Sequence, residues 1–406
     1  MRVLHIGKFY PPFAGGIENF LGDLLPALRR NGLAVAALVH DHLSSGISTR
    51  NISTSPMVYR VPCFGTLLYA PVSPMFPLIL RHVIGKFRPH ILHLHMPNTS
   101  AFWVMALSCY RRIPWVVHWH ADVVPSEIDS RMAIAYRLYR PFEQYLLGRA
   151  ASIVTTSRSY LVSSKPLSPW RDKCQVIPLG LDSMRLKMPD LDLRNWAEGI
   201  WRQKTTRVLA IGRLTYYKGY EVLVKAAAHA SNISVLIVGE GDRKRQLQGL
   251  IGELGLRGRV TALGFLEEQR LHALLATCDC LCLPSVERTE AFGLVLLEAM
   301  RYSKPAVASD VRGSGIGWVV RHKQTGLLVR PGDPIDLARA LRVMAEIPEL
   351  RKRMGKAAAE RFDKVFRIDQ VARKLMAMYQ TISPIKGINH DTKCLLSNHQ
   401  TQLLLR

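Results

Sequence analysis

Short apolar segments alternate with helical segments along both halves of the chain. In the first half, segments of strand length lie at 2–7, 34–40, 90–95, 114–119 and 151–157. Between them, apolar residues recur with helical spacing at 17–30, 75–87 and 131–148. The strands are apolar along their length, and this indicates a parallel sheet covered by helices on both faces.

The alternation stops near residue 183 and starts again near residue 206. Residues 183–205 are mixed in polarity and poorly periodic, which is typical of a linker. Further strand-like segments follow at 207–212, 233–241, 259–265, 278–285, 304–309 and 326–333. We therefore predict an N-terminal domain at 1–182, a C-terminal domain at 206–360, a helix at 361–382 that packs back toward the N-terminal domain, and a flexible tail at 383–406.

The length supports the same division, because 406 residues exceed one ordinary core and favour two domains of roughly 150–200 residues. The predicted fold class is α/β, with two doubly wound, Rossmann-like domains facing a cleft. In such sheets ligands bind beyond the carboxyl ends of the strands. The loops at those ends are therefore where functional residues are expected.

The composition is that of a globular protein, with 48% hydrophobic and 21% charged residues. No apolar run approaches the roughly 18 residues of a membrane-spanning helix, and the chain opens on the strand-like "RVLHIG" without a basic leader. We therefore expect a cytoplasmic protein. The net charge of +24 is spread over both halves. It favours nucleic acid, anionic lipid or a phosphorylated small molecule as a partner, or serves solubility alone.

The segment "TCDCLCLP" carries Cys278, Cys280 and Cys282. Spacing by two places them on one face of a strand, where small buried cysteines are common. A metal site needs ligands that converge from separate turns, so a core role is favoured over metal binding.

The segment "RTEAFGLVLLEAM" keeps two glutamates, Glu290 and Glu298, in an apolar setting, although unpaired buried charge is costly. A helix that begins near Gly293 would leave Glu290 in the preceding loop and the amides of Phe292, Gly293 and Leu294 without helical partners. The oxygens of a sugar could accept hydrogen bonds from those amides, and its hydroxyls could donate hydrogen bonds to Glu290. Glu298 could accept hydrogen bonds from the paired hydroxyls of a ribose. The spacing therefore predicts a nucleotide sugar as the ligand.

Two other loops carry groups that suit phosphate. In "AIGRLTYYKGY", Arg213 ends a predicted strand and Lys218 precedes a helix, so both cations can meet a diphosphate. In "FYPPFAGGIENF", Gly15 and Gly16 allow a close approach of backbone amides to an anion at a helix N-terminus. A Gly-Gly pair alone is more often only a turn.

The motifs "PPFAGGIE", "GRLTYYKG", "EAFGLVLLEAM" and "TGLLVRPGD", in this order, resemble the retaining glycosyltransferases of family four, which have the GT-B fold. The resemblance covers the chain from Arg2 to about Tyr379. It implies a nucleotide diphosphate sugar held mainly by the C-terminal domain and an acceptor held mainly by the N-terminal domain. It also implies these roles: Arg213 and Lys218 neutralise the diphosphate, Glu290 and the amides of Phe292, Gly293 and Leu294 hold the sugar, Glu298 binds ribose, and Gly16 closes on the phosphates.

Two histidine pairs invite a different interpretation. "HLHMP" places His93 and His95, and "HWHADVV" places His118 and His120, each pair on one face of a strand. Zinc would need further ligands, and no carboxylate is evidently committed to the cluster. Structural histidines are a second possibility. The resemblance implies instead that His120 meets the donor sugar or stabilises charge near the reacting carbon, and we favour that role over zinc.

The resemblance implies a front-face mechanism in which the leaving phosphate accepts the proton of the acceptor, without metal or another cofactor. The protein then contributes positioning and charge stabilisation. The "DLD" at Asp190 to Asp192 matches the metal-binding pattern of other glycosyltransferases, but it lies in the predicted linker.

"HWHADVV" and "SGIGWVVRHKQTGLLV" look like enzymes of bacterial surface polysaccharides, such as O-antigen, which often use GDP-mannose or GDP-rhamnose. A UDP-sugar remains possible, because base selection rests on loop backbone near Gly264, Phe265 and Leu266. The implied acceptor is a glycan or a polyprenyl-diphosphate-linked glycan.

The segment 73–90 mixes an apolar face with basic residues, which suits either contact with an anionic membrane or a helix covering the sheet. With the overall charge, we expect peripheral association with the cytoplasmic face of the inner membrane. Three alternative functions remain. A nucleic-acid-binding protein would need a recognition element, and this sequence shows none of the usual kinds. A sugar-nucleotide epimerase would need no acceptor, and a phosphorylase would need a pyridoxal-bearing lysine and a longer chain.

Overall fold

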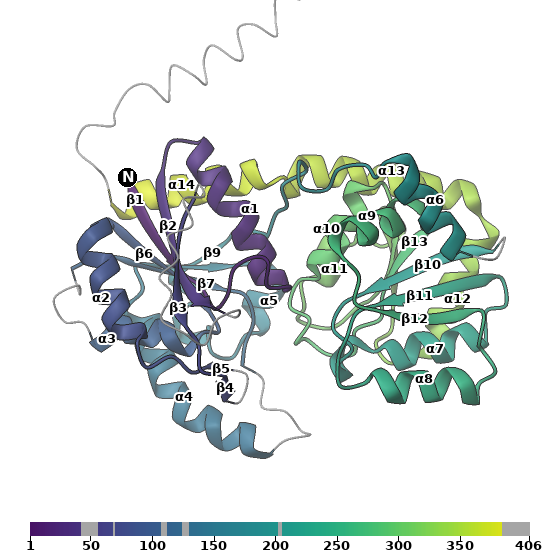
Figure 1. The fold of residues 1–406 in the computed structure, drawn as a ribbon, viewed down its shortest axis with the longest axis horizontal. Coiled ribbons are helices and arrows are strands. Elements are labelled where there is room, and N and C mark those ends of the chain that lie inside the picture. Colours follow the sequence, from purple (N-terminus) through teal and green to yellow (C-terminus); the bar gives the residue numbers. More distant parts are fainter. Residues whose placement is uncertain (42–55, 68–69, 107–111, 124–129, 202–204, 384–406) are drawn as a thin grey trace, which may run out of the picture.

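The computed structural model describes residues 1–41, 56–67, 70–106, 112–123, 130–201 and 205–383. It contains two α/β domains side by side, each built on a parallel sheet between layers of helices (Figure 1). The predicted α/β fold class is therefore confirmed. Residues 384–406 of the tail predicted at 383–406 lie outside the described residues.

The N-terminal sheet has the strand order β3-β2-β1-β6-β7-β8-β9, and all its pairs are parallel. Its strands are β1 (Arg2–Ile6), β2 (Ala34–Asp41), β3 (Met57–Pro62), β6 (Ile91–Met96), β7 (Trp115–Trp119), β8 (Ser152–Thr155) and β9 (Cys174–Val176). The helices around it are α1 (Gly16–Arg30), α2 (Phe76–Phe87), α3 (Trp103–Ala106), α4 (Ser130–Arg149) and α5 (Arg158–Ser163). The described part of this domain also contains a short antiparallel pair, β4 (Thr66–Leu67) and β5 (Ala70–Pro71), and the 3-10 helices η1 (Thr99–Phe102) and η3 (Ser168–Lys173).

The C-terminal sheet has the order β12-β11-β10-β13-β14-β15 and is also parallel. Its strands are β10 (Thr206–Ile211), β11 (Ile233–Val238), β12 (Val260–Gly264), β13 (Cys280–Leu283), β14 (Ala306–Ser309) and β15 (Gly326–Val329). The helical elements of this half are η4 (Tyr216–Lys218), α7 (Tyr220–Ala228), α8 (Lys244–Glu253), α9 (Glu268–Thr277), α10 (Leu294–Arg301), α11 (Ile316–Val319), α12 (Pro334–Glu346) and α13 (Pro348–Arg361).

Strand order locates the functional loops. Each sheet is built outward from its first strand and then returns to the other side of that strand, so the order switches between β1 and β6 and between β10 and β13. In open α/β sheets, ligands bind beyond the carboxyl ends of the strands at such switch points. The segments that follow β1, β10 and β13 contain Gly16 at the start of α1, Lys218 at the end of η4 and Glu290 in the loop before α10, respectively.

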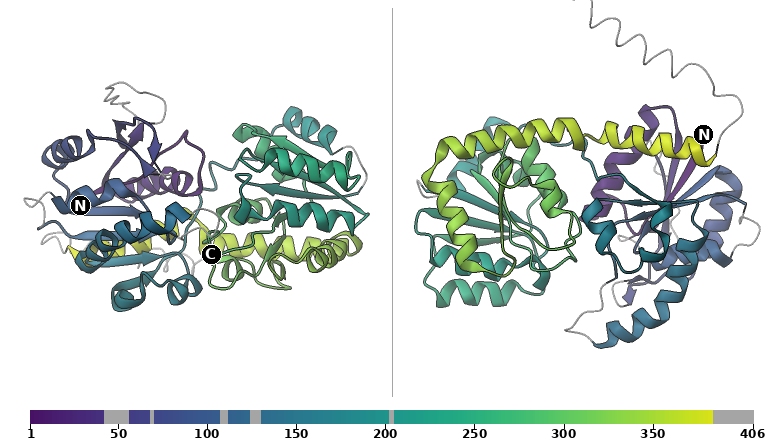
Figure 2. Two further views of the ribbon diagram at one scale, coloured as in Figure 1. Left: turned by 90° about the horizontal axis from the view of Figure 1, so that it is seen from below. Right: turned by 180° about the vertical axis from the view of Figure 1, so that it is seen from behind.

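The last helices of the described chain cross from one domain to the other. After α13, a short π-helical turn (Phe362–Phe366) leads into α14 (Ile368–Ile382). The yellow helix α14 then lies along the N-terminal domain (Figure 2). There the Tyr379 hydroxyl is 2.5 Å from Nδ1 of His93, and both groups are buried. The last helix is therefore part of the N-terminal core.

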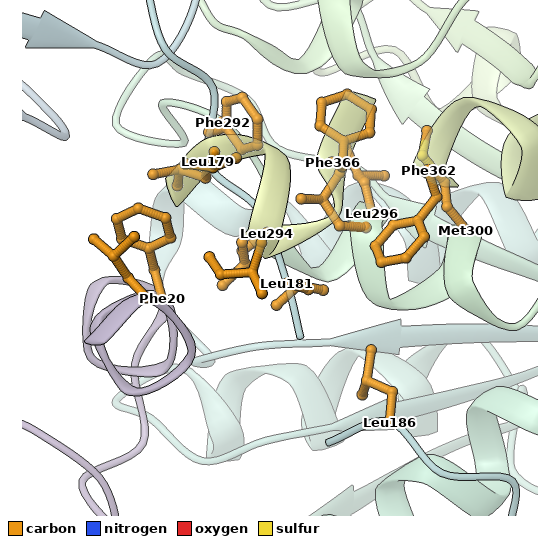
Figure 3. Close-up of a cluster of buried hydrophobic side chains, with 14 of the residues drawn as sticks. Phe20, Leu179, Leu181, Leu186, Phe292, Leu294, Leu296, Met300, Phe362 and Phe366 are labelled. Carbon is orange, nitrogen blue, oxygen red and sulfur yellow. The ribbon is translucent and has the colours of Figure 1, made fainter. Parts of the chain in front are cut away.

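Apolar packing also joins the domains where α1 meets α10. Phe20 of α1 and Leu294 of α10 belong to one buried cluster that includes Leu179, Leu181 and Phe292 (Figure 3). A Cβ atom placed on Gly16 would lie 3.9 Å from Cβ of Leu294. The N-termini of the two helices are therefore held beside each other.

Four local features differ from, or add to, the sequence interpretation. The edge strand β3 was not predicted. Helix α6 (Leu191–Ile200) lies inside the predicted linker and was not predicted either. Its N-cap is Asp190, whose Oδ1 accepts a hydrogen bond from the Leu193 amide at 2.9 Å. Cys278 does not share a strand face with Cys280 and Cys282, because it caps the end of α9 and joins the other core cluster. Helix α2 buries the apolar face of the 73–90 segment against the sheet.

Among the described residues, no helix combines the length and the apolar character needed to cross a bilayer.

Candidate active site

The loop before α10 ends in a glycine for a steric reason. Gly293 is the N-cap of α10 and has φ of 78°, a conformation that favours glycine. A Cβ on Gly293 would also lie 2.8 Å from the Leu283 side chain and 2.9 Å from that of Leu296. Within the described residues, the amides of Phe292, Gly293 and Leu294 donate no hydrogen bond. Three donors therefore face the same helix terminus, as the sequence predicted.

Lys218 and Glu290 form an ion pair at this terminus. Nζ of Lys218 donates to Oε2 of Glu290, and both side chains are mostly buried. Burial alone would lower the pKa of Lys218, but the Glu290 carboxylate outweighs this and raises it. Lys218 is therefore a fixed cation at neutral pH. The sequence interpretation placed the two residues on different parts of the ligand and did not predict that they pair.

Ser314 supports the loop that carries Glu290. Its Oγ donates to the backbone carbonyl of Glu290 at 2.5 Å, and the Gly315 amide donates to the Ala291 carbonyl at 2.7 Å. The same Oγ accepts from the Ile316 amide at 3.2 Å. The carboxylate of Glu290 is thus presented from a braced backbone rather than from a free loop.

Arg213 lies across from charged groups of the N-terminal domain. It is exposed and, among the described residues, forms no ion pair. Burial lowers the pKa of Lys8, the Glu18 carboxylate opposes this, and the Arg213 guanidinium adds to it. Burial raises the pKa of Glu18, while Lys8 and Arg213 act against that shift. Arg213, Lys8 and Glu18 therefore share one electrostatic environment at the domain boundary.

Glu18 occupies the N-terminus of α1 next to the Gly-Gly turn. A Cβ on Gly15 would lie 2.1 Å from Oε2 of Glu18, so the carboxylate folds over the glycine backbone. Because an anion is stabilised at a helix N-terminus, Glu18 holds the place that the sequence assigned to phosphate beside Gly16. Sequence reasoning did not single out Glu18.

Glu298 is the second carboxylate of the E-x7-E pair and is buried. Burial raises its pKa to about 7, against the lowering effect of Arg185. Nη2 of Arg185 lies 3.7 Å from Oε1 of Glu298, while Nε of the same guanidinium lies 3.0 Å from Oδ1 of Asp23 on α1. Nη1 of Arg185 lies 2.5 Å from Oε1 of Glu268. Arg185 therefore links the Glu298 site to the N-terminal domain.

The predicted nucleobase region lies at the end of β12. Gly264 ends the strand with φ of 79°, and Phe265 is 65% exposed. The Phe265 amide donates to Oε1 of Glu240 at 3.3 Å. An exposed aromatic ring at a strand end can stack on a base, and Leu266 packs against the core beside it.

The histidines form a buried stack across three neighbouring strands. His5 on β1 lies in register with His93 on β6, and His95 with His118 on β7. His120 directly follows β7, and its ring lies 4.2 Å from that of His118. Burial lowers the pKa of every ring in the stack, so all are neutral near pH 7.

Hydrogen bonds connect three of these rings in a row. Nδ1 of His5 lies 3.1 Å from Nε2 of His95, and Nδ1 of His95 lies 2.9 Å from Nε2 of His120. Nδ1 of His120 is buried and has no partner in the described part of the chain. Since each neutral imidazole has one donor and one acceptor nitrogen, the tautomer of His120 is coupled to that of His95.

Two triplets of this stack have nitrogens close enough to hold a metal ion. They are His5, His93 and His95, and His95, His118 and His120, with ligand atoms within 4.8 Å of one another. The rings are stacked, however, with an interplanar angle of 5° between His118 and His120. Parallel rings direct their nitrogen lone pairs side by side rather than toward one point. A dication there would also lack a carboxylate partner in the triplet.

An ion pair that the sequence did not predict joins the two domains beside these groups. Nη1 of Arg288 donates to Oδ2 of Asp122 at 2.8 Å. Oδ1 of Asp122 accepts from Nε1 of Trp119 at 2.8 Å and from Oγ of Ser164 at 2.7 Å. The Arg288 guanidinium also lies over the Tyr160 ring, 4.7 Å from its centroid. Asp122 is thus fixed within the N-terminal domain and receives Arg288 from the other.

Comparison with known proteins places this arrangement in a family. The Glycosyl transferase 4-like domain matches residues 15–180, and Glycosyl transferases group 1 matches residues 196–361. The D-rhamnosyltransferase WbpZ of Pseudomonas aeruginosa is 32% identical over 379 residues, covering 90% of this chain and 92% of the relative. The chain belongs to the family 4-like glycosyltransferases with the GT-B fold.

Further relatives agree with this membership. The O-antigen chain mannosyltransferase C of Escherichia coli is 28% identical over 393 residues, covering 95% of this chain and 100% of the relative. Among solved structures, the sucrose-phosphate synthase of Thermosynechococcus elongatus has a TM-score of 0.78 at 24% identity, covering 94% of this chain and 98% of that structure. Anabaena HepE, solved with UDP and glucose, has a TM-score of 0.75 at 21% identity, covering 94% and 100%. These two structures support the fold.

In this glycosyltransferase the structure brings most of the predicted site residues to the domain boundary. Lys218, Glu290 and the amides of residues 292–294 share one helix terminus, and Gly16 lies opposite on α1. Arg288 and Asp122 were missed, although each stands two residues from a predicted site residue, Glu290 and His120. That proximity in the sequence was the available signal.

Proposed function

We propose that this glycosyltransferase transfers a hexose from a nucleotide diphosphate sugar, with retention of configuration and without a metal ion, to a glycan or a polyprenyl-diphosphate-linked glycan of the cell surface. The observation that carries the proposal is the fixed Lys218 cation beside the unpaired amides at the α10 terminus, with Glu298 in the following turn. Lys218 and the amides suit a diphosphate, and Glu298 suits a ribose.

The assigned roles follow from the charge of each group. Lys218 and the exposed Arg213 neutralise the diphosphate, and Gly16 of α1 approaches it from the other domain. When a donor binds, the diphosphate competes with Glu290 for Lys218, and this releases the Glu290 carboxylate to accept from the sugar hydroxyls. Glu298 accepts from the ribose, and the backbone near Gly264 and Leu266, with the Phe265 ring, contacts the base.

The reaction needs little chemistry from side chains. The bond between C1 of the sugar and the phosphate oxygen breaks, a bond from C1 to the acceptor oxygen forms on the same face, and the acceptor proton passes to the leaving phosphate. Lys218, Arg213 and the helix terminus stabilise the charge that develops on that phosphate. His120, with its unpaired Nδ1, contacts the donor sugar beside the reacting carbon.

The favoured donors are GDP-mannose and GDP-rhamnose. Their support is that relatives at about 30% identity are named as an O-antigen mannosyltransferase and a D-rhamnosyltransferase. A UDP-sugar is the second choice, and the HepE structure with UDP and glucose supports it only through a shared fold. The net charge of +24 favours peripheral contact with an anionic membrane, where a lipid-linked acceptor lies.

A donor screen tests the proposal. The protein is incubated in EDTA with GDP-mannose, GDP-rhamnose or a UDP-sugar, with and without an acceptor glycan, and release of the nucleoside diphosphate is measured. Release that depends on the acceptor supports transfer. Isomerisation of the donor without acceptor would favour an epimerase on this fold, and an absolute need for a divalent cation would contradict the metal-independent mechanism.

A further inference from the structure

Helix α4 presents an apolar stripe to solvent. Ile134, Leu138, Phe142 and Tyr145 are exposed by 64%, 71%, 54% and 49%, respectively. Steps of four, four and three residues place them along one side of the helix. Exposed apolar side chains that gather on one side of a helix, unlike apolar residues scattered singly over a surface, can form an interaction site.

The stripe is separate from the face of α4 that builds the domain. Glu143, Leu146 and Leu147 of the same helix are fully buried. Figures 1 and 2 place α4 at the edge of the N-terminal domain opposite α14. The helix is thus anchored on one side, and the stripe on its other side is not part of the core.

Arginines accompany the stripe, and acidic residues do not. Arg137 and Arg140 are exposed on one flank of the stripe, with Arg140 on the side nearer the buried Glu143. Glu143 is the one acidic residue of α4, and it is buried. An apolar strip with arginines beside it has the composition of a helix that lies in the interface of an anionic bilayer.

Neighbouring aromatic rings hold the stripe in place. The Phe102 ring stacks on Phe142 with 5.8 Å between centroids and lies 5.0 Å from the Tyr139 ring. Trp103, the next residue after Phe102, is 42% exposed. The Phe142 ring of the stripe is therefore packed against a neighbouring ring before any contact is made, which lowers the entropic cost of docking.

Charge argues against a second copy of this chain as the occupant. Pairing two α4 faces would bring Arg137 and Arg140 toward the same arginines of the other copy, without an exposed acidic residue on the helix to meet them. Anionic headgroups can meet those arginines while the acyl boundary receives the side chains of the stripe.

Helix α2, the sequence candidate for membrane contact, lacks such a face. Its apolar residues Phe76, Leu80, Val83 and Ile84 are buried, and Leu78 is exposed by 62%. We propose that the outward face of α4, and not α2, docks this protein on an anionic membrane surface. The inference deepens the proposed function, on which it rests for its purpose, since docking would bring the enzyme to a lipid-linked acceptor.

Vesicle binding tests the docking without any donor or acceptor. The full chain is sedimented at low salt with vesicles of phosphatidylcholine alone or of phosphatidylcholine and phosphatidylglycerol in equal parts. Binding to the mixed vesicles is expected. In the variant Ile134→Ser with Leu138→Ser, which keeps the Phe142–Phe102 contact, affinity should fall by about 10-fold or more. Arg137→Gln with Arg140→Gln should lower it by a similar factor, about 10-fold or more.

A matched control comes from α2. Leu78→Ser with Lys86→Gln removes one exposed apolar and one basic side chain from that helix and should leave vesicle binding unchanged. Failure of the wild type to bind mixed vesicles, or equal loss in the α2 and α4 variants, would overturn the proposal. The proposal would also be overturned if the wild type were a dimer that the α4 variants convert to a monomer, with no vesicle binding by the wild type or the variants. Transfer to a water-soluble acceptor should be unaffected by the α4 variants. A wild type that transfers the sugar but does not bind the mixed vesicles refutes only the docking, and a wild type that binds the vesicles but transfers no sugar refutes only the proposed function.

Discussion

The guanidinium of Arg288 reaches across the domain boundary to the carboxylate of Asp122, with 2.8 Å between Nη1 and Oδ2. Arg288 stands two residues before Glu290, and Asp122 stands two residues after His120. The pair therefore ties the loop that carries Glu290 to the strand end that carries His120. It links the two domains at the place where, in the proposed function, donor and acceptor meet.

Replacing Arg288 should slow transfer without unfolding the protein. Arg288→Ala leaves the Asp122 carboxylate with its bonds from Trp119 and Ser164, but the link between the loops is lost. We expect kcat/KM to fall by about 10- to 100-fold, because misplacement of reacting groups is costly. A double-mutant cycle with Asp122→Asn should give a coupling energy of about 1–3 kcal/mol in kcat/KM. Additive effects of the two changes would show that the pair does not align the site.

Lys218 and Glu298 should affect different kinetic constants. Lys218→Ala removes the cation that, in the proposed mechanism, stabilises the leaving diphosphate, so kcat should fall by roughly 100- to 1,000-fold. Lys218→Arg should restore little, because a planar guanidinium does not fit the position of a buried ammonium. Glu298→Ala should mainly raise the KM for the donor. Steady-state kinetics with varied donor separate the two, and equal, small effects would contradict both roles.

The raised pKa of Glu298 predicts a pH dependence of nucleotide affinity. Burial raises the pKa of this carboxyl to about 7, and the ribose hydroxyls need the ionised form as acceptor. Affinity for the nucleoside diphosphate should therefore rise as pH increases through 7, with a proton released on binding below that pH. Calorimetric titrations at several pH values test this, and Glu298→Gln should flatten the dependence. An identical slope in the variant would exclude Glu298 as the responsible group.

The same shift predicts a change in stability of the unliganded protein. The folded state keeps the Glu298 proton up to about pH 7, whereas the unfolded state releases it near the ordinary value of 4.5. The folded state therefore binds more protons in this window, and the contribution of Glu298 to stability decreases as pH rises from about 4.5 to 7. The melting temperature of Glu298→Gln should rise relative to that of the wild type toward the upper end of that pH window. Thermal unfolding at pH 5 and pH 8 measures the difference.

His95 should act on catalysis through His120. His95→Phe keeps a ring in the buried stack but removes the hydrogen bond to Nε2 of His120. If His120 contacts the donor sugar in a defined tautomer, kcat should fall by about 10-fold and the pH profile should change. His93→Phe is the matched control, because His93 lies in the same stack and bonds to Tyr379 and His118 instead. Equal losses in both variants, in proportion to their loss of stability, would indicate packing alone.

The periodic part of the fold could be predicted from the sequence. The fully apolar strands predicted two parallel sheets, and the motif around Gly293 located the helix start at the residue where the structure has it. Strand β3 was missed because it is an edge strand with a half-buried Arg60 in its middle. Helix α6 was missed because it is short and mostly exposed, so its pattern does not stand out.

Pairings between distant residues could not be predicted in the same way. The sequence identified Lys218 and Glu290 as site residues, but their ion pair depends on how the loops after β10 and β13 converge. The interaction of Arg185 with Asp23 and Glu298 depends likewise on the docking of α1 beside α10. On α2 and α4 the sequence shows apolar and basic residues alike, and only packing reveals which apolar face is buried.

We propose that the boundary between these domains holds a nucleotide diphosphate sugar for transfer with retention. Proton NMR of one reaction in EDTA, with GDP-mannose and an acceptor glycan, follows the donor anomeric signal and the new glycosidic signal together. We expect loss of donor only when acceptor is present, an α-linked product, and loss of this activity in Lys218→Ala. A β-linked product, or donor conversion without acceptor, would show that the boundary does not hold the donor for transfer with retention.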